Sequence, residues 1–359
     1  MKGLALYRPS TRDGVLPIAY VHALARLGHD GLVLIEPTDS FVSVGYFDAT
    51  AEAVDIDACR RQGLPVVRRE IGGGPVLLGP GQVFYNLVLP RSDPVLPPIL
   101  DDIYRYLSEP VIETYRHFGL DVQYRPINDL VTAAGRKITG QGAADIADRF
   151  CFVGAVLRHF DIVRMASVIR VPDEKLRAHL RQVLDDNVTS ISREIGREPS
   201  TEDVIAALEH FFSLVLGPLD LRPLPPEVED LAAQLAEHLQ SPDVLFEPRS
   251  RKHVTTKIRE GVVVRHGQRK AQGGYIRSSV TIRDNAIADL QLSGDFTFIP
   301  KSGFTVLVQT LVGAPFEPST VRAVIDAFFL SRGVECPGVT AADFTEAITG
   351  DPGTASDRS

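Results

Sequence analysis

The sequence predicts an α+β protein with mixed or antiparallel sheets flanked by helices, and a smaller α+β domain toward its C-terminal end. The chain has 359 residues, which fits two domains at roughly 150 residues each. It contains 29 Gly and 25 Pro, a content that favours turns and short strands over a long helical bundle. Its hydrophobic fraction of 44% and charged fraction of 23% are typical of globular domains.

The N-terminal domain is expected to begin with short strands separated by Gly and Pro. Residues 32–35 and 41–46 read as one pair of strands. Apolar positions between residues 94 and 119 follow helical spacing, with Pro110 as a break or a second start. Further expected strands are 65–69, 76–78, 83–89, 130–134, 136–139 and 153–157.

Two further helices are expected over residues 172–184 and 201–216. The second has Ser200 as its N-cap and Gly217-Pro218 as its stop signal. Residues 217–227 hold four prolines and are the best candidate for a linker. The sequence therefore predicts a catalytic-type domain over 1–217, a linker over 218–227, an accessory domain over 228–350 and a disordered tail over 351–359.

The accessory domain is expected to begin with a helix over residues 228–239. Strands follow at 262–265, 275–283 and 286–292, and Asp284-Asn285 forms a hairpin turn between the last two. Helices over 319–332 and 341–348 complete the domain.

The charge and cysteine content restrict the class of protein. A net charge of −8 makes the chain a poor candidate for coating nucleic acid, because that affinity comes mainly from cations on phosphates. No apolar run reaches the roughly 20 residues of a membrane span. Cys59, Cys151 and Cys336 lie far apart and cannot all pair, which favours a reducing compartment. We expect a soluble cytoplasmic protein with neither a nucleic-acid nor a membrane partner.

The first candidate for chemistry is the segment Arg68-Arg69-Glu70-Ile71-Gly72-Gly73-Gly74-Pro75-Val76. Consecutive glycines permit positive φ angles and let backbone N–H groups approach a ligand. Such a loop can form an anion-binding nest, and two arginines before it would add phosphate or carboxylate recognition. A plain hairpin turn beside a solvated arginine pair is the alternative interpretation.

The second candidate is Asn128-Asp129-Leu130 followed by Gly135-Arg136-Lys137-Ile138-Thr139-Gly140. In a strand, Lys137 points away from the face of Ile138, so it can face a ligand cleft while Ile138 packs inside. A lysine between glycines acts as a compact charge on an acyl or phosphoryl oxygen. The alternatives are a surface lysine on an edge strand and, for Asp129, a turn former rather than a Mg²⁺ ligand.

Together these two motifs resemble the lipoate–protein ligase A family, within the wider biotin/lipoate ligase fold. The resemblance covers residues 17–216 and extends more faintly through the second domain. It implies a ligase that activates lipoate with ATP to lipoyl-adenylate and then transfers the lipoyl group, or octanoate, to a lysine of a lipoyl-carrier domain.

The resemblance also implies a set of site residues. Lys137 would polarise the acyl carbonyl and contact the α-phosphate as the catalytic residue. Asp129 would be the nearest contact for Mg²⁺. The remaining predicted residues are Arg68, Arg69, Gly72, Gly73, Gly74 and Val76 around the phosphates, and Val76, Leu77, Leu78, Lys137 and Gly140 around the lipoate.

The sequence departs from the family pattern at several positions. The His-Asp pair that usually follows the glycines is absent, Pro75 removes one backbone N–H, and Gln141 replaces a serine. Two other functions therefore remain open. One is an ATP-independent octanoyl or lipoyl transferase, which would require a thiol such as that of Cys151; the other is a non-catalytic lipoate-binding relative.

Overall fold

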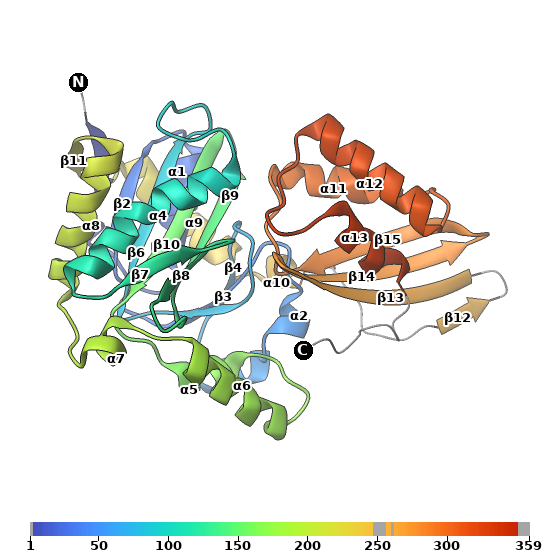
Figure 1. The fold of residues 1–359 in the computed structure, drawn as a ribbon, viewed down its shortest axis with the longest axis horizontal. Helices are drawn as coiled ribbons and strands as arrows, with labels where there is room; N and C mark the ends of the chain where they lie inside the picture. Colours follow the sequence, from blue (N-terminus) through green and yellow to red (C-terminus); the bar gives the residue numbers. More distant parts are fainter. Residues whose placement is uncertain (1–2, 247–255, 260–261, 351–359) are drawn as a thin grey trace. The chain divides into compact units, whose positions relative to one another are not determined.

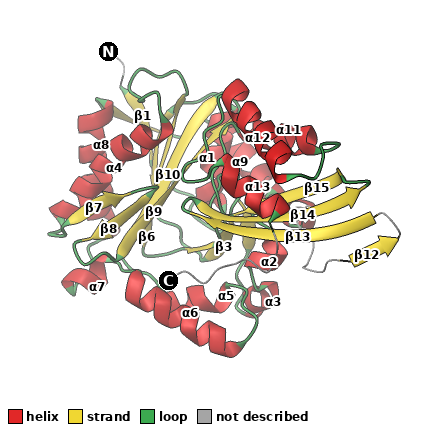
Figure 2. Ribbon diagram, turned by 45° about the vertical axis from the view of Figure 1, so that its right-hand side comes forward, coloured by secondary structure: helices red, strands yellow, loops and turns green. Residues whose placement is uncertain are grey.

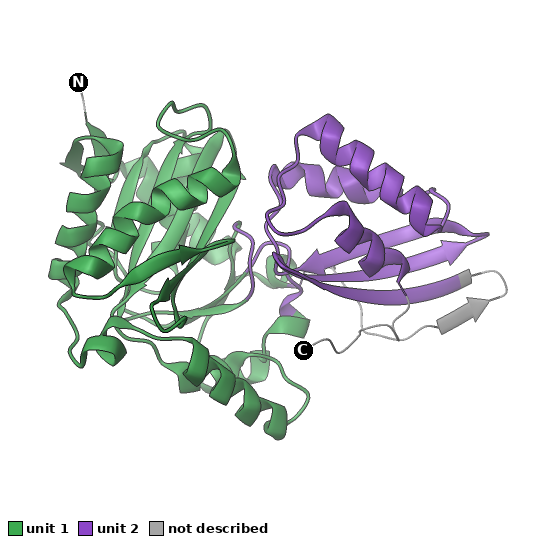
Figure 3. Cartoon of the chain, in the orientation of Figure 1, with its two compact units in different colours: residues 1–44, 51–70, 75–245 green, residues 45–50, 71–74, 246–359 purple. Residues whose placement is uncertain are grey.

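The computed structural model describes residues 3–246, 256–259 and 262–350, so the expected tail at 351–359 lies outside the described residues. The chain divides into two compact units (Figure 3). Unit 1 comprises residues 1–44, 51–70 and 75–245, and unit 2 comprises residues 45–50, 71–74 and 246–359. Two short segments from the N-terminal half of the sequence thus belong to the C-terminal unit.

Among the described residues, unit 1 is built on an eight-stranded mixed sheet (Figure 1). The first three strands in spatial order are parallel, and every later neighbour is antiparallel. This sheet and its flanking helices confirm the predicted α+β class. The spatial order is β11 (Leu219–Arg222), β1 (Leu4–Tyr7), β2 (Gly31–Ile35), β6 (Gln82–Pro90), β10 (Arg149–Leu157), β9 (Lys137–Ile146), β8 (Asp129–Thr132) and β7 (Val122–Arg125).

Helices cover both faces of this sheet (Figure 2). α1 (Leu16–Arg26) and α9 (Pro226–His238) pack together on one face, where the Asn86 amide of β6 donates to the Pro17 carbonyl at 3.4 Å. α4 (Leu100–His117) and α8 (Thr201–Leu216) pack on the other face. There the ring of Tyr85, the residue before Asn86 in β6, lies 5.8 Å from the ring of Phe212 in α8. Successive strand residues point to opposite faces, so β6 contributes to both helical layers.

A second, three-stranded sheet stands beside the large one in the order β4 (Val66–Arg68), β3 (Phe41–Val44) and β5 (Val76–Leu78). The expected pairing of residues 32–35 with 41–46 is therefore wrong. β2 is buried along its whole length and pairs with β1 and β6 inside the large sheet, whereas β3 pairs with β4 and β5. Further helices lie wholly or mostly in unit 1: α2 (Thr50–Ala53), α3 (Ile56–Arg61), α5 (Ile162–Val168), α6 (Glu174–Asn187), α7 (Ile191–Ile195) and α10 (Pro242–Leu245).

Two helix signals gave different outcomes. α8 begins after Ser200, whose hydroxyl accepts the Asp203 N–H at 3.1 Å, and ends before Gly217, as predicted. Pro110 does not break α4, which continues through it to His117. The missing N–H costs one hydrogen bond, but the apolar face of α4 on both sides of Pro110 is buried and holds the helix together.

The predicted linker at 218–227 is also corrected by the structure. Its residues 219–222 form β11, which pairs in register with β1, and Pro226 begins α9. Pro lacks an N–H and is well placed at the first turn of a helix, so these prolines mark element ends rather than a flexible connection. Apart from the segments 45–50 and 71–74, unit 2 begins after Leu245, so α9 and the predicted start of the accessory domain at 228 lie in unit 1.

Unit 2 is an α+β unit of its own. Its antiparallel sheet has the order β12 (Thr256–Arg259), β13 (Val262–Ala271), β14 (Gly274–Arg283) and β15 (Ala286–Gly294). Asp284 and Asn285 have φ of 50° and 59°, which confirms the predicted tight turn between β14 and β15. The helices of its described part are α11 (Lys301–Leu311), α12 (Pro318–Arg332) and α13 (Ala341–Thr349).

Candidate active site

Lys137 is the first residue of β9, and a β-bulge sets its position. β8 and β9 pair Leu130 with Thr139 but Val131 with Lys137, so one extra residue, Ile138, is inserted in β9. Ile138 is fully buried, while the Lys137 side chain is 41% exposed. A Cβ at position 140 would lie 2.9 Å from the Lys137 Nζ, so Gly140 leaves the space that the amine occupies.

Asp129 is the direct partner of this amine. Its Oδ1 lies 2.6 Å from the Lys137 Nζ, and its carboxylate is only 20% exposed. In β8, Asp129 stands opposite Gly140. The structure thus brings together three of the predicted site residues, Asp129, Lys137 and Gly140.

The backbone of Lys137 is held by the segment that leads into α7. The Thr189 N–H donates to the Lys137 carbonyl at 2.8 Å, and Lys137 forms a parallel bridge with Val188. The neighbouring Arg136 Nη2 forms a 2.6 Å ion pair with Glu194, whose carboxylate also accepts the Thr189 hydroxyl. The backbone of the strand start that carries the amine is therefore fixed by these contacts, while the amine itself is paired with Asp129.

Asp129 does not fit the predicted role of a Mg²⁺ ligand in this arrangement. Its Oδ1 is paired with Lys137, and its Oδ2 lies 3.0 Å from Arg125 Nη2, so both oxygens already face cations. The part of the chain that the structure describes also holds no group of three or more His, Cys, Asp or Glu residues arranged for a metal. We assign no step to a metal at Asp129.

The glycine-rich segment belongs to unit 2, where its glycines have a packing role. A Cβ on Gly72 would lie 2.4 Å from the Phe296 carbonyl oxygen, and a Cβ on Gly45 would lie 1.7 Å from that of Gly73. The N–H of Gly73, which has φ of 92°, donates to the Phe296 carbonyl at 3.3 Å. In place of the expected free nest of amides, the structure shows backbone packed closely on backbone.

The same packing holds residues 45–50 in unit 2. The Phe47 ring stacks on Phe296 at 5.2 Å and meets the edge of Phe304 at 4.9 Å. Asp48 is buried and lies 2.9 Å from Arg277 Nη1. Burial raises the pKa of Asp48 above its ordinary value, and the positive charge of Arg277 opposes that shift.

The two arginines before the glycines are placed differently from the prediction. Arg68 is 2% exposed and donates from Nε and Nη2 to the carbonyls of Val244 and Leu245, both at 2.8 Å. Its guanidinium therefore secures α10 rather than facing a phosphate. Arg69 donates to the Ser43 carbonyl at 3.0 Å and lies partly buried beside β3.

The apolar strand Val76–Leu78 contributes to two environments. Leu77 is buried in a small core with Val42, Val44 and Met165, and its N–H contacts the Met165 sulfur at 3.2 Å. Leu77 is thus part of this core and does not line an open slot. Val76 is exposed and, by strand alternation, shares the opposite face with Leu78, so these two remain candidates for a substrate contact.

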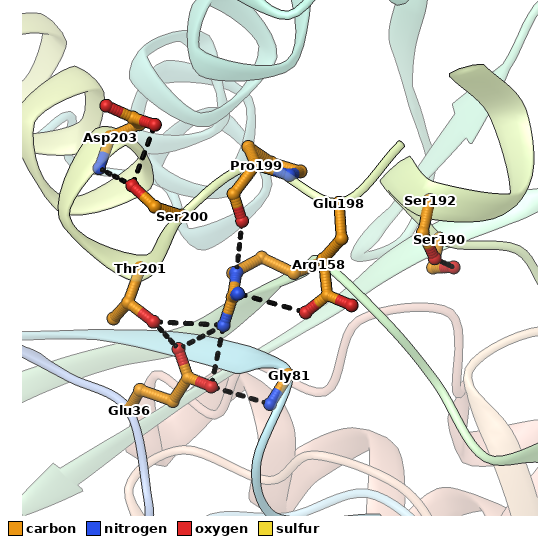
Figure 4. A network of polar contacts seen from close by, with 10 residues as sticks. All are labelled: Glu36, Gly81, Arg158, Ser190, Ser192, Glu198, Pro199, Ser200, Thr201 and Asp203. Carbon is orange, nitrogen blue, oxygen red and sulfur yellow. Dashed lines mark hydrogen bonds and ion pairs between the residues drawn. The ribbon is translucent and has the colours of Figure 1, made fainter. Parts of the chain in front are cut away.

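A buried ion-pair network was not predicted from the sequence (Figure 4). Glu36, at the end of β2, pairs through both carboxylate oxygens with Arg158 Nη1 at 2.8 and 2.7 Å. It also accepts the Thr201 hydroxyl at 2.6 Å and the Gly81 N–H at 2.7 Å. Arg158 donates to the Pro199 carbonyl at 2.8 Å and accepts the Ser192 N–H on its own carbonyl.

This network contacts the segment that holds Lys137 at two places, Ser192 and residues 199–201. The segment runs from Val188 and Thr189, beside β9, to Thr201 at the start of α8. Glu36 and Arg158 are 122 positions apart in the sequence, so no local pattern predicts their ion pair. The one sequence signal for this network is a glutamate at the end of an otherwise apolar strand.

None of the three cysteines, all of which lie in the described ranges, has the character of an activated nucleophile. Cys59 is buried, and burial raises its pKa to about 11. Cys151 is 0% exposed within β10. Burial raises the pKa of Cys336 well above its ordinary value. A nucleophilic cysteine instead requires a depressed pKa and access to substrate.

Other features of the described residues limit the site further. None of the helices in the described ranges is both long enough and apolar enough to cross a bilayer.

Gln141, which replaces the family's serine, is buried and donates to the Tyr85 hydroxyl at 3.2 Å while accepting from Ser108 at 2.7 Å. Its side chain therefore links β9 to β6 and α4.

Most of unit 1 matches a known protein family. Residues 19–213, more than half of the chain, match the lipoyl protein ligase A/B catalytic domain. The chain therefore belongs to the lipoyl protein ligase A/B family, as the resemblance in the sequence indicated.

Individual relatives include both ligases and transferases. Lipoate-protein ligase A subunit 1 of Thermoplasma acidophilum is 26% identical over 60% of this chain and 85% of its own length. Octanoyltransferase LipM of Kyrpidia tusciae is 27% identical over 54% of this chain and 78% of its own length. Sequence similarity thus leaves two acyl-transfer chemistries.

Solved structures agree with this placement. The bi-partite lipoate protein ligase of Thermoplasma acidophilum, studied with its E2 lipoyl domain, superimposes with a TM-score of 0.60 at 26% identity, over 71% of this chain and 100% of that one. Lipoate-protein ligase A bound with ATP gives a TM-score of 0.55 at 25% identity, over 68% of this chain and 99% of that one.

Proposed function

We propose that this protein is an ATP-dependent lipoate–protein ligase. It would join lipoate, or octanoate, to the α-phosphate of ATP with release of pyrophosphate, and then transfer the acyl group from this acyl-adenylate to a lysine of a lipoyl-carrier domain with release of AMP. The observation that carries the proposal is the Lys137 amine, half-exposed over Gly140 and held by one carboxylate. The related ligase that binds ATP, and the one studied with a lipoyl domain, support the choice of nucleotide and acceptor.

The chemistry needs a fixed cation of this kind. A carboxylate oxygen attacking an α-phosphate brings two anions together, and their repulsion is strongest where water is excluded. An ammonium held between them lowers that repulsion and stabilises the charge that develops in the transition state. Because the backbone of Lys137 is fixed at Thr189 and Val188, its amine can exchange Asp129 for a substrate oxygen without disturbing β9.

Lipoate-dependent ATP–pyrophosphate exchange on the purified protein tests the proposal. Exchange measures the activation step without any acceptor. We expect exchange that depends on lipoate or octanoate, and a mass increase on an apo lipoyl domain when it is added with ATP. A protein that transfers an acyl group without ATP would instead be a transferase.

Replacing Cys151 with serine separates these two functions. We expect Cys151→Ser to keep activation and transfer within about twofold of wild type, because a fully buried thiol does not reach a substrate. The rates of exchange and of acyl transfer to a lipoyl domain are measured with and without ATP. Loss of ATP-independent transfer in this variant would establish a thiol-dependent transferase instead of a ligase.

A further inference from the structure

Arg125 forms the outer part of a three-residue charge cluster around the proposed catalytic amine. It ends β7 and stands opposite Asp129 in the β7–β8 pair. Its Nη2 lies 3.0 Å from Asp129 Oδ2, while Lys137 Nζ lies 2.6 Å from Asp129 Oδ1. One carboxylate is thus shared between two cations, and the cluster carries a net positive charge.

We propose that Arg125 is a positioning residue that sets how tightly Asp129 holds Lys137. The inference rests on the proposed function, in which the Lys137 amine must leave Asp129 for an anionic substrate. A carboxylate with a single partner concentrates its charge on that partner. A second cation on the other oxygen weakens the first pair, because the two cations repel each other and share the same charge.

The local structure supports this role for Arg125. Its Nη1 also contacts the Gly135 carbonyl at 3.4 Å, so the guanidinium bridges β7 to the turn that precedes Lys137. The other nearby cation, Arg136, is paired with Glu194 and makes no contact with Asp129 among the described interactions. Among the described ion pairs, Arg125 is the cation on the second oxygen of Asp129, where it can balance Lys137.

A merely structural surface ion pair gives a different expectation. Arg125 is 48% exposed, and exposed pairs contribute little to stability. If Arg125 were only a surface residue of the β7–β8 hairpin, its removal would leave both the modification rate of Lys137 and the exchange activity unchanged. If it acts through Asp129, its effect must vanish once the Asp129 carboxylate is gone.

The experiment is a double-mutant cycle with Arg125→Ala, Asp129→Asn and both together, in the full chain. Exchange activity is measured as kcat and as KM for lipoate. We expect Arg125→Ala to raise KM and lower kcat/KM by about threefold to tenfold, and Arg125→Lys to restore most of the loss. The double variant should match Asp129→Asn alone. Additive losses in the double variant, or an unchanged Arg125→Ala, would overturn the proposal.

A second readout does not depend on the proposed reaction. The rate at which an acetylating reagent modifies Lys137 is followed by mass spectrometry of its peptide. We expect about threefold slower modification in Arg125→Ala and faster modification in Asp129→Asn. An equal rate in Arg125→Ala and wild type counts against the role of Arg125. A slower rate in a chain without exchange activity keeps that role and removes the ligase function.

Arg116→Ala is the matched control. Arg116 is also 48% exposed and pairs with an acidic residue three positions away, Glu113, but on α4. We expect this variant to leave both the exchange kinetics and the modification rate of Lys137 at wild-type values.

Discussion

Replacing Lys137 with alanine should lower the rate of lipoate-dependent ATP–pyrophosphate exchange by about 10²–10³ while the protein stays folded. The change removes the charge that would neutralise the approaching oxygens. It leaves a half-exposed side chain truncated at a strand start whose backbone contacts to Val188 and Thr189 remain. The measurement is the steady-state exchange rate, with the unfolding midpoint as a check on folding.

Two further variants give this result its meaning. Lys175, an exposed lysine on α6, supplies the control, and Lys175→Ala should keep the wild-type rate. Lys137→Arg should recover only part of the activity, because a planar guanidinium is larger than an ammonium in the space over Gly140. A Lys137→Ala protein with near-normal exchange would remove this residue from the mechanism.

Local signals predicted those elements whose ends are decided locally. The Ser200 hydroxyl and Gly217 set both ends of α8, and Asp284-Asn285 set the turn between β14 and β15. The exposure of the Lys137 side chain was predicted in the same way, because alternation along a short strand separates it from the buried Ile138. Each of these inferences needs only residues within a few positions of each other.

The sequence misled where distant segments meet. The prolines at 218–227 suggested a linker, but pairing with β1 places residues 219–222 in the sheet. Arg68 suggested a phosphate contact, yet it binds carbonyls 176 and 177 positions away. The glycines at 72–74 suggested a nest, but Gly72 packs on the Phe296 carbonyl and Gly73 on Gly45. A composition signal cannot report which remote backbone approaches a glycine.

The close approach of Gly45 to Gly73 makes Gly45→Ala the second variant with a large expected effect. A Cβ at position 45 would lie 1.7 Å from the Gly73 carbonyl oxygen and 2.8 Å from its carbon. Both atoms belong to backbone, which cannot rotate away as a side chain would. We expect unfolding to become easier by about 1–3 kcal/mol, as for other overpacked sites, and the segment 71–74 to shift. The measurement is the urea unfolding midpoint of the full chain.

Gly303→Ala separates a local clash from a general intolerance to alanine in unit 2. Gly303 lies in α11, and the nearest atom to its added Cβ would be the Phe298 ring at 3.4 Å. Gly303 is the third residue of α11, and alanine is preferred to glycine within a helix by up to about 1 kcal/mol, so this variant should be neutral or more stable. If Gly45→Ala also kept wild-type stability, the backbone contact between residues 45 and 73 could not be what requires glycine there. If it lost stability but kept exchange activity, the glycine-rich segment would act only in the packing of unit 2. Loss of both stability and exchange activity would show that the activation step depends on the packing of the glycine-rich segment.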